Sequence, residues 1–166
     1  MAIKKTNARK TIIGLEEEVK LFISHKKNTF IRRKAKIDTG ARTTAIDVTV
    51  AKKLGLLSVY TEFHRLLPSI KVNSKNFEQV RRRLAKQITP KLKKQIPGLY
   101  DIRVIPATNG VSIRPYVRLH IHLRDKHIRT VASIVDRKVL LYSVLIGKAD
   151  LAGFLIDPTK NVYKVA

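Results

Sequence analysis

The chain has 166 residues, no cysteine and no tryptophan, and its 35 Lys and Arg residues against 12 Asp and Glu residues give a net charge of +23. This length predicts a single domain over residues 1–166 with a sizeable core, and the lack of cysteine excludes disulfides and thiolate zinc sites. No apolar run approaches the roughly 20 residues of a membrane-spanning helix, and the N-terminus lacks the apolar stretch of a secretory signal. We therefore expect a cytoplasmic protein with no membrane partner, and the charge favours binding to a polyanion such as nucleic acid.

Residues 17–37 predict a β-hairpin. EVKLFIS and TFIRRKAKID alternate apolar and polar side chains on either side of the turn residues SHKKN. A period of two places Arg33 with the apolar side chains on one face, and Arg32, Lys34 and Lys36 on the other. Three positive charges in register favour contact with phosphate groups, and a solvated strand face is the alternative.

The second strand ends in Asp38-Thr39-Gly40. Two aspartates about 3 Å apart that share one proton can hydrolyse peptides, one as base toward water and the other as acid toward the carbonyl. Gly40 would allow the close backbone approach that such a pair needs. Because the tripeptide occurs once, catalysis would require a symmetric homodimer. Asp, Thr and Gly are also ordinary turn residues, so a turn without catalysis is the alternative.

Residues 76–96, NFEQVRRRLAKQITPKLKKQI, have the apolar spacing of a helix. Pro90 interrupts it, so we expect one helix to about Ile88 and a short second one through Ile96, with a capping box from Asn76 and Gln79 at the start. Residues 63–99 hold 10 basic residues and 1 acidic residue, which favours phosphate binding over a plain solvated face. The cations expected to contact RNA here are Arg81, Arg82, Arg83, Lys86, Lys91, Lys93 and Lys94.

The remainder predicts strands. DIRVIPA leads to the turn dipeptide Asn109-Gly110, and residues 114–124 then alternate strictly before a turn expected at Asp125-Lys126. The polar face of the alternating strand carries Arg118, His120, His122 and Arg124. Arg118 and Arg124 are expected RNA contacts, and the two histidines face either RNA or solvent. A metal held by these histidines with His127 is disfavoured by the flanking cations, so we expect no metal and no cofactor.

Five separated stretches carry a resemblance. IGLEEEVKL, AKIDTGARTTAID, NGVSIRPYV, IRTVASIVDR and VLIGKADLAGFLIDP resemble, in this order, the retropepsin-like family of ATP-dependent zinc proteases, and the resemblance breaks at residues 57–99. It implies a small closed β fold in which Leu145-Ile146-Gly147 packs beneath Asp38-Thr39-Gly40. It further implies that Asp38 is the catalytic carboxylate, that Thr39 braces the loop and that Gly40 supplies backbone freedom. The sequence offers no ligand set for the zinc of the family label.

These observations together predict a mainly β (α+β), retropepsin-like single domain with a basic helical insertion at about 63–99. The leading functional expectation is an RNA-binding protein, ribosomal or ribosome-associated, whose partners are structured rRNA and neighbouring ribosomal proteins. Recognition would rest on shape, because only 6% of the chain is aromatic. The competing expectation is a homodimeric aspartic endopeptidase that uses Asp38 from each subunit. A DNA-binding protein is a third class, without a motif to read base edges.

Overall fold

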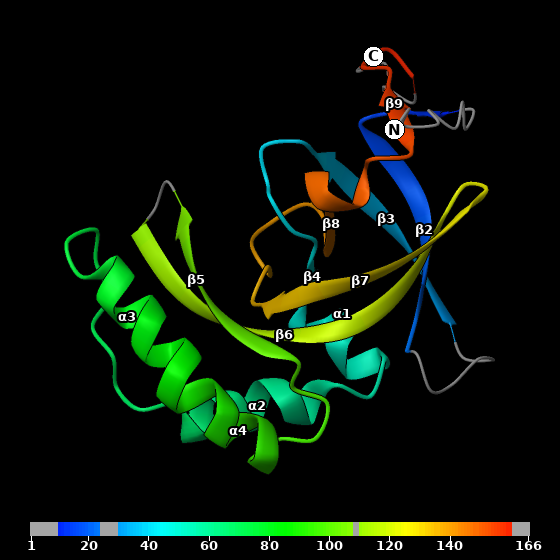
Figure 1. Ribbon diagram of the computed structural model, residues 1–166. Coiled ribbons are helices and arrows are strands. Elements are labelled where there is room, and N and C mark those ends of the chain that lie inside the picture. Colours follow the sequence, from blue (N-terminus) through cyan, green and yellow to red (C-terminus); the bar gives the residue numbers. More distant parts are fainter. Residues whose placement is uncertain (1–9, 24–29, 108–109, 161–166) are drawn as a thin grey trace, which may run out of the picture.

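The protein is a mainly β structure built around a closed six-stranded barrel (Figure 1). The computed structural model describes residues 10–23, 30–107 and 110–160. Its strands are β1 (Thr11–Ile13), β2 (Glu16–Phe22), β3 (Phe30–Asp38), β4 (Ala45–Asp47), β5 (Asp101–Ala107), β6 (Gly110–Leu123), β7 (Lys126–Val135), β8 (Val144–Gly147) and β9 (Phe154–Ile156). Its helices are α1 (Val48–Lys53), α2 (Leu57–Leu66), α3 (Phe77–Arg83), the π-helix η1 (Leu84–Ile88), α4 (Thr89–Gln95) and the 3₁₀ turn η2 (Lys148–Asp150).

The barrel closes because β2 pairs on both sides. The strands follow the order β2-β3-β8-β4-β7-β6, and β2 then pairs antiparallel with β6 as well as with β3. The alternation predicted for residues 114–124 is confirmed, since Val117, Leu119, Ile121 and Leu123 are fully buried inside the barrel. The two paired strands predicted for residues 17–37 are also confirmed, with Arg32, Lys34 and Lys36 exposed, and the predicted turn SHKKN lies outside the described residues. The pairing of β2 with β6 covers the edge of β2 over residues 19–22, the kind of edge along which sheets otherwise risk aggregation.

The barrel is not a simple meander, because one strand is inserted between two others that follow each other in the chain. β3 and β4 follow each other in the chain, yet β8 lies between them, parallel to β3 and antiparallel to β4. The connection from Thr39 to Thr44 must therefore cross over the end of β8. In register, Asp38 lies beside Gly147. β1 and β9 pair parallel to each other in a separate two-stranded sheet.

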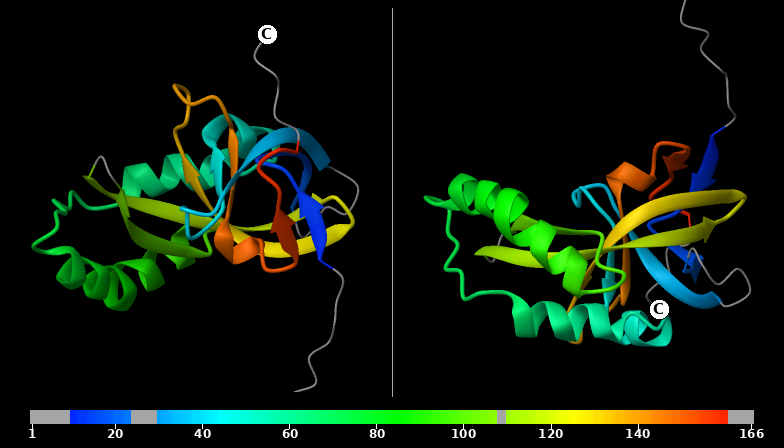
Figure 2. Two further views of the ribbon diagram at one scale, coloured as in Figure 1. Left: turned by 90° about the horizontal axis from the view of Figure 1, so that it is seen from above. Right: turned by 60° about the horizontal axis from the view of Figure 1, so that its bottom comes forward.

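Helices α1 to α4, with η1, lie between β4 and β5 in the chain. Of these, α2, α3 and α4 lie beside the β5–β6 hairpin, whereas α1 packs against β4 and β7 (Figures 1 and 2). The helical region begins at Val48, ahead of the expected insertion at 63–99. The predicted break at Pro90 takes the form of a π turn in one continuous rod, with Thr89 N–H donating to Leu84 O. A proline lacks the N–H of a regular helix, and the widened turn directly before it accommodates the loss. Among the described residues no helix is long and apolar enough to cross a membrane.

The capping box expected from Asn76 and Gln79 is wrong. Asn76 precedes α3, but its side chain makes no capping hydrogen bond. Its amide instead accepts from Asn73 N–H at 2.8 Å and donates to Lys71 O at 2.9 Å, which folds the preceding turn. Asn side chains compete for nearby backbone groups in this way. The apolar spacing itself is confirmed, because Val80, Leu84 and Ile88 are buried.

The turn between β6 and β7 is Arg124–Asp125, one residue earlier than predicted. Arg124 adopts φ 56°, so its side chain leaves the polar strand face. Its guanidinium forms a two-pronged pair with Glu17, at 2.7 Å (Nε–Oε2) and 3.0 Å (Nη2–Oε1). Glu17 is buried and also accepts from Gly14 N–H. Arg124 therefore neutralises a buried carboxylate, and the expectation that it also contacts RNA stays a prediction.

We predict that Arg124→Gln lowers the free energy of unfolding by about 2 kcal/mol, because it removes the two charge-assisted hydrogen bonds that Arg124 gives the buried Glu17 carboxylate. Urea unfolding measures the change. The matched control is Arg129→Gln, an exposed cation on the neighbouring strand, for which we expect a change within about 0.5 kcal/mol. Equal effects of the two substitutions would contradict the assignment of Arg124 as a structural residue.

Candidate active site and nucleic-acid interface

Asp38 stands at the end of β3, where the chain turns to cross β8. Its Oδ1 accepts hydrogen bonds from Gly40 N–H at 2.9 Å and Ala41 N–H at 3.1 Å. Asp38 is half-buried, while Thr39 and Gly40 are exposed. Two donors on one oxygen fix the orientation of the carboxylate. The structure thus brings Asp38, Thr39 and Gly40 together in one loop that presents a carboxylate at the surface.

The crossing loop is held from below by the end of β8. Lys148 N–H donates to Ala41 O at 2.9 Å and Ala149 N–H donates to Arg42 O at 3.2 Å. A Cβ added to Gly147 would lie 2.4 Å from the carbonyl carbon of Thr43. Only glycine lets the loop pass so close to the strand. Leu145-Ile146-Gly147 therefore lies beneath the Asp38 loop, as the resemblance implies.

Asp150 clamps this arrangement, and sequence reasoning missed it. Its Oδ2 accepts from Thr44 Oγ1 at 2.5 Å and from Thr130 Oγ1 at 2.9 Å, and Thr44 Oγ1 in turn accepts from Gly147 N–H at 3.2 Å. One carboxylate thus joins β7, the crossing loop and β8. Thr44 is fully buried, whereas Asp150 and Thr130 are half-buried, so the clamp reaches into the structure and supports the loop. No local pattern around Asp150 announces this role, because its partners are distant in the chain.

Arg137 interacts electrostatically with Arg114, Asp47 and Asp38. Arg137 follows β7; burial is the main cause that lowers the pKa of its guanidinium, Arg114 lowers that pKa further, and Asp47 and Asp38 raise it. Burial raises the pKa of Asp47, but hydrogen bonds from Thr49 and from Arg137 N–H outweigh it and hold that pKa below its ordinary value. Asp47 also caps α1 by accepting from Thr49 N–H at 2.8 Å. Arg137 N–H donates to Asp47 Oδ2 at 2.7 Å, so Arg137 is tied to the start of the helical region.

The β5–β6 hairpin contacts the same loop. Tyr116 on β6 is buried, and its hydroxyl lies 3.0 Å from Thr43 Oγ1. The Arg103 guanidinium on β5 lies 4.4 Å from the centre of the Tyr116 ring. The turn residue Asn109 lies outside the described residues, whereas Gly110 has the positive φ of 116° that a tight turn requires. The hairpin, rather than the helices, is thus the element next to the Asp38 loop.

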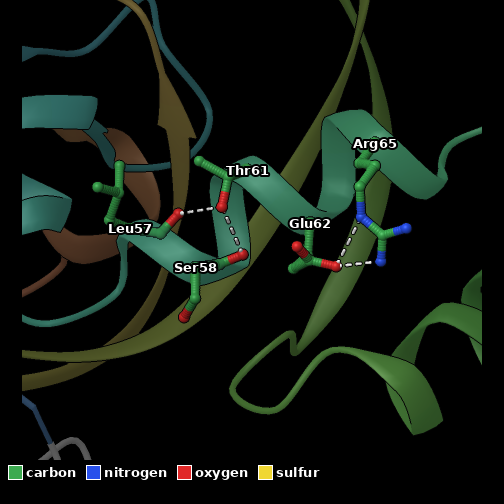
Figure 3. Close-up of polar contacts among 5 residues, drawn as sticks. All are labelled: Leu57, Ser58, Thr61, Glu62 and Arg65. Carbon is green, nitrogen blue, oxygen red and sulfur yellow. Dashed lines mark hydrogen bonds and ion pairs between the residues drawn. The ribbon is translucent and has the colours of Figure 1, made fainter.

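The helix cations lie on one surface. All seven of the predicted residues between Arg81 and Lys94 are exposed on α3, η1 and α4. Arg81 is paired with Glu78, with a shortest nitrogen–oxygen distance of 2.9 Å, so the surface is less uniformly positive than expected. On α2, by contrast, Glu62 pairs with Arg65 and Thr61 donates to backbone carbonyls (Figure 3). The unbalanced charge is therefore a property of α3 to α4 in particular.

Two of the three β3 cations face acids, which the sequence analysis did not anticipate. Across the β2–β3 ladder, Lys36 lies opposite Glu16 and Lys34 opposite Glu18, and Lys34 forms an ion pair with Glu16. Only in the pair of Arg32 with Lys20 do two cations face each other. The interpretation of Arg32, Lys34 and Lys36 as a row of cations without acids is therefore wrong, and Arg32 is the member best placed to meet phosphate.

The three histidines of β6 and β7 do not fit a zinc ion. His120 Nδ1 lies 3.1 Å from His127 Nε2, so these two nitrogens bond each other rather than converge on a common point. Burial, His127, Arg129 and His122 lower the pKa of His120; burial, His127 and Lys20 lower that of His122. Cations also repel a divalent ion. Within the described residues no cluster of three or more His, Cys, Asp or Glu forms a metal site.

Comparisons with known proteins give little guidance. No family model matches the chain, and no curated protein matches its sequence. Among solved structures, the crystal structure of a protein of unknown function (DUF785) from Legionella pneumophila is 18% identical; the alignment covers 89% of this chain and 93% of that chain, with a TM-score of 0.42. The function must therefore be argued from the site itself.

We predict that Gly147→Ala destabilises the protein by more than about 2 kcal/mol, because the new methyl group must displace the Thr43 backbone. Chemical denaturation provides the measurement. Gly153→Ala is the matched control, since its added carbon would meet only the flexible Lys126 side chain, at 3.0 Å. A Gly147→Ala protein as stable as the control would show that the loop does not cross β8 as described.

Proposed function

We propose that this chain is a retropepsin-like aspartic endopeptidase that acts as a homodimer, with Asp38 of each subunit forming the catalytic pair. The observation that carries the proposal is the position of Asp38. Its carboxylate is half-exposed, held by Gly40 and Ala41 N–H groups, in a loop that crosses a strand inserted between β3 and β4. This loop holds the Asp38 carboxylate in a fixed orientation and leaves it accessible to a substrate.

The chemistry requires a second carboxylate. In the dimer, the ionised Asp38 takes a proton from a water molecule, whose oxygen attacks the peptide carbonyl carbon. The protonated Asp38 of the partner subunit donates its proton to the carbonyl oxygen. The tetrahedral intermediate then breaks its carbon–nitrogen bond: the leaving amine takes a proton from one carboxylate, and a hydroxyl of the intermediate returns its proton to the other, which restores the singly protonated pair. Two carboxylates about 3 Å apart share one proton because they cannot both be ionised at the same time.

Features around the loop support a homodimer contact. Thr39 and Gly40 are exposed and carry no charge. Val139, Leu140 and Leu141 are exposed in the loop that follows Arg137, with Val139 at 96%. Residues 37–62 hold three basic and three acidic residues, so this part of the chain is net neutral. An apolar and neutral contact is where two strongly positive chains repel each other least.

We predict that Asp38→Asn reduces cleavage of an unfolded protein substrate by at least about 10²-fold while leaving unfolding and self-association unchanged. Asp136→Asn, which removes a carboxylate of the neighbouring exposed loop, is the control and should cleave normally. Specific activity should also fall on dilution as dimers dissociate. Full cleavage by Asp38→Asn, or by a species that sediments as a monomer, would overturn the proposal.

A second candidate function is RNA binding, as a ribosomal or ribosome-associated protein. It is favoured by the surface of α3, η1 and α4, where six of the seven predicted cations have no carboxylate partner among the described contacts. An isolated protein would gain from mixing signs along such a helix, and phosphate groups would supply the missing negative charge. Structured rRNA is the partner that this candidate function implies.

We predict that Arg82→Glu/Arg83→Glu/Lys86→Glu weakens binding to rRNA fragments at least about tenfold and lowers the salt dependence of binding, because phosphate contacts are lost. Arg81 is left unchanged because it pairs with Glu78. Asp38→Asn and Lys138→Glu serve as controls and should bind normally. Unchanged affinity of the triple variant, measured by filter binding across several salt concentrations, would refute RNA contact at this surface and would leave the peptidase proposal untouched.

A further inference from the structure

Two cross-strand rows of side chains cover the outside of the barrel from β3 to β7. The first row runs Arg32, Lys20, His122 and His127, and the second runs Phe30, Phe22, His120 and Arg129. Each row crosses β3, β2, β6 and β7 in register, so the eight side chains form one continuous surface. Neither row contains Asp or Glu. We call these eight residues the aromatic–basic face.

The rings of this face are in mutual contact. Ring centres lie 5.6 Å apart for Phe22 and Phe30, 4.7 Å for Phe22 and His122, and 4.5 Å for His122 and His127. Phe30 is 43% exposed. Lys20 and Arg32 lie over its ring, at 5.4 and 5.7 Å from the centre. Phe30 is therefore an accessible aromatic ring between two cations, in a chain of which only 6% is aromatic.

The face continues into a hollow. Its volume is about 720 Å³, and its lining includes His120 and Arg129 from the face together with Tyr100 and Arg118. Arg118 lies 4.8 Å from the centre of the Tyr100 ring, and Lys93 of α4 lies 5.4 Å from the same ring. The hollow therefore connects the aromatic–basic face to the basic surface of α3 to α4. Cations and aromatic rings alternate along this path, and Phe30 and His127 are its exposed rings.

We propose that the aromatic–basic face binds a single-stranded polynucleotide, with unpaired bases stacked on Phe30 and neighbouring rings and phosphates held by Lys20, Arg32 and Arg129. The inference deepens the RNA-binding candidate function and rests on it. Stacking on protein rings requires bases that are free of a duplex, and each stacked base contributes about 1–3 kcal/mol. Four neighbouring strands span about 14 Å, room for a few nucleotides. Arg118 and the hollow would take the next phosphate and direct the strand toward α4.

The test uses the full chain and a fluorescent oligouridylate of about 10 nucleotides, with a DNA oligomer of the same length, an RNA duplex and polyaspartate as further probes. Phe30→Ala should weaken binding of the single strand about 5- to 150-fold and leave duplex binding unchanged. Phe30→Leu keeps an apolar side chain and should lose nearly as much, whereas Phe30→Tyr should bind normally. Because Phe30 is exposed, these variants should fold, and urea unfolding checks that they do.

The possible outcomes separate this inference from the function on which it rests. Preferential binding of the single strand, lost in Phe30→Ala, supports the face; the RNA and DNA oligomers then show whether the 2′-hydroxyl contributes. Binding of duplex and single strand with equal sensitivity to Arg82→Glu/Arg83→Glu/Lys86→Glu and none to Phe30→Ala overturns the face and leaves RNA binding intact. Absence of all nucleic-acid binding overturns both. Stronger binding of polyaspartate, lost in Phe30→Ala, would assign the face to an acidic protein instead.

A pH series gives a second readout. The groups that face His120 are His127 and Arg129, and those that face His122 are His127 and Lys20; these neighbours and burial lower the pKa of both histidines. Both are therefore mainly neutral near pH 7 and gain protons as pH falls, and phosphate favours the protonated form. Affinity for oligouridylate should rise from about pH 7.5 to about pH 5.5. His120→Asn/His122→Asn should flatten that rise; an equally steep rise in the variant would overturn the assigned contacts.

Discussion

The insertion of β8 between β3 and β4 is the constraint on which the rest of the structure depends. The chain can pass from β3 to β4 only by crossing β8, and the crossing is possible because Gly147 has no side chain to meet the Thr43 backbone. The same crossing turns the chain sharply after β3, which brings Gly40 and Ala41 N–H groups onto the Asp38 carboxylate. The placement of Asp38 and the clamp at Asp150 are thus consequences of a single topological step.

The acidic side chains show how a chain of net charge +23 is distributed. Glu17 neutralises Arg124, Glu16 pairs with Lys34, and Asp47 and Asp150 hold backbone and hydroxyl groups inside the fold. These four carboxylates therefore have their partners within the fold. The cations of α4 and of the aromatic–basic face lack such partners in the described part of the chain, so the positive excess gathers on surfaces that an external polyanion can reach.

Local periodicity in the sequence was sufficient to predict the β2–β3 hairpin, the alternation of β6 and the helical rod. It could not predict which strands become neighbours, because β2 meets β6 about a hundred residues away. That long-range pairing places Phe22 beside His120, and so it creates a cluster of rings that the low aromatic content of the chain conceals. It likewise brings Glu17 to Arg124, whose turn was expected one residue later. The position of Leu145-Ile146-Gly147 under Asp38 was anticipated only from the family resemblance, since no spacing rule links residues so far apart.

The two proposed functions are physically connected through charge. Two copies of this chain repel each other, and the repulsion opposes any dimer that would pair Asp38 with its counterpart, most strongly at low ionic strength. A polynucleotide on the aromatic–basic face or on α3 to α4 would neutralise part of that charge away from the Asp38 loop, where it does not compete with a peptide. By linkage, a ligand that favours the dimer must itself bind the dimer more tightly than the monomer, by the same factor. Peptidase activity that depends on a pair of carboxylates would then respond to nucleic acid through the monomer–dimer equilibrium alone, without any change in the geometry of either site.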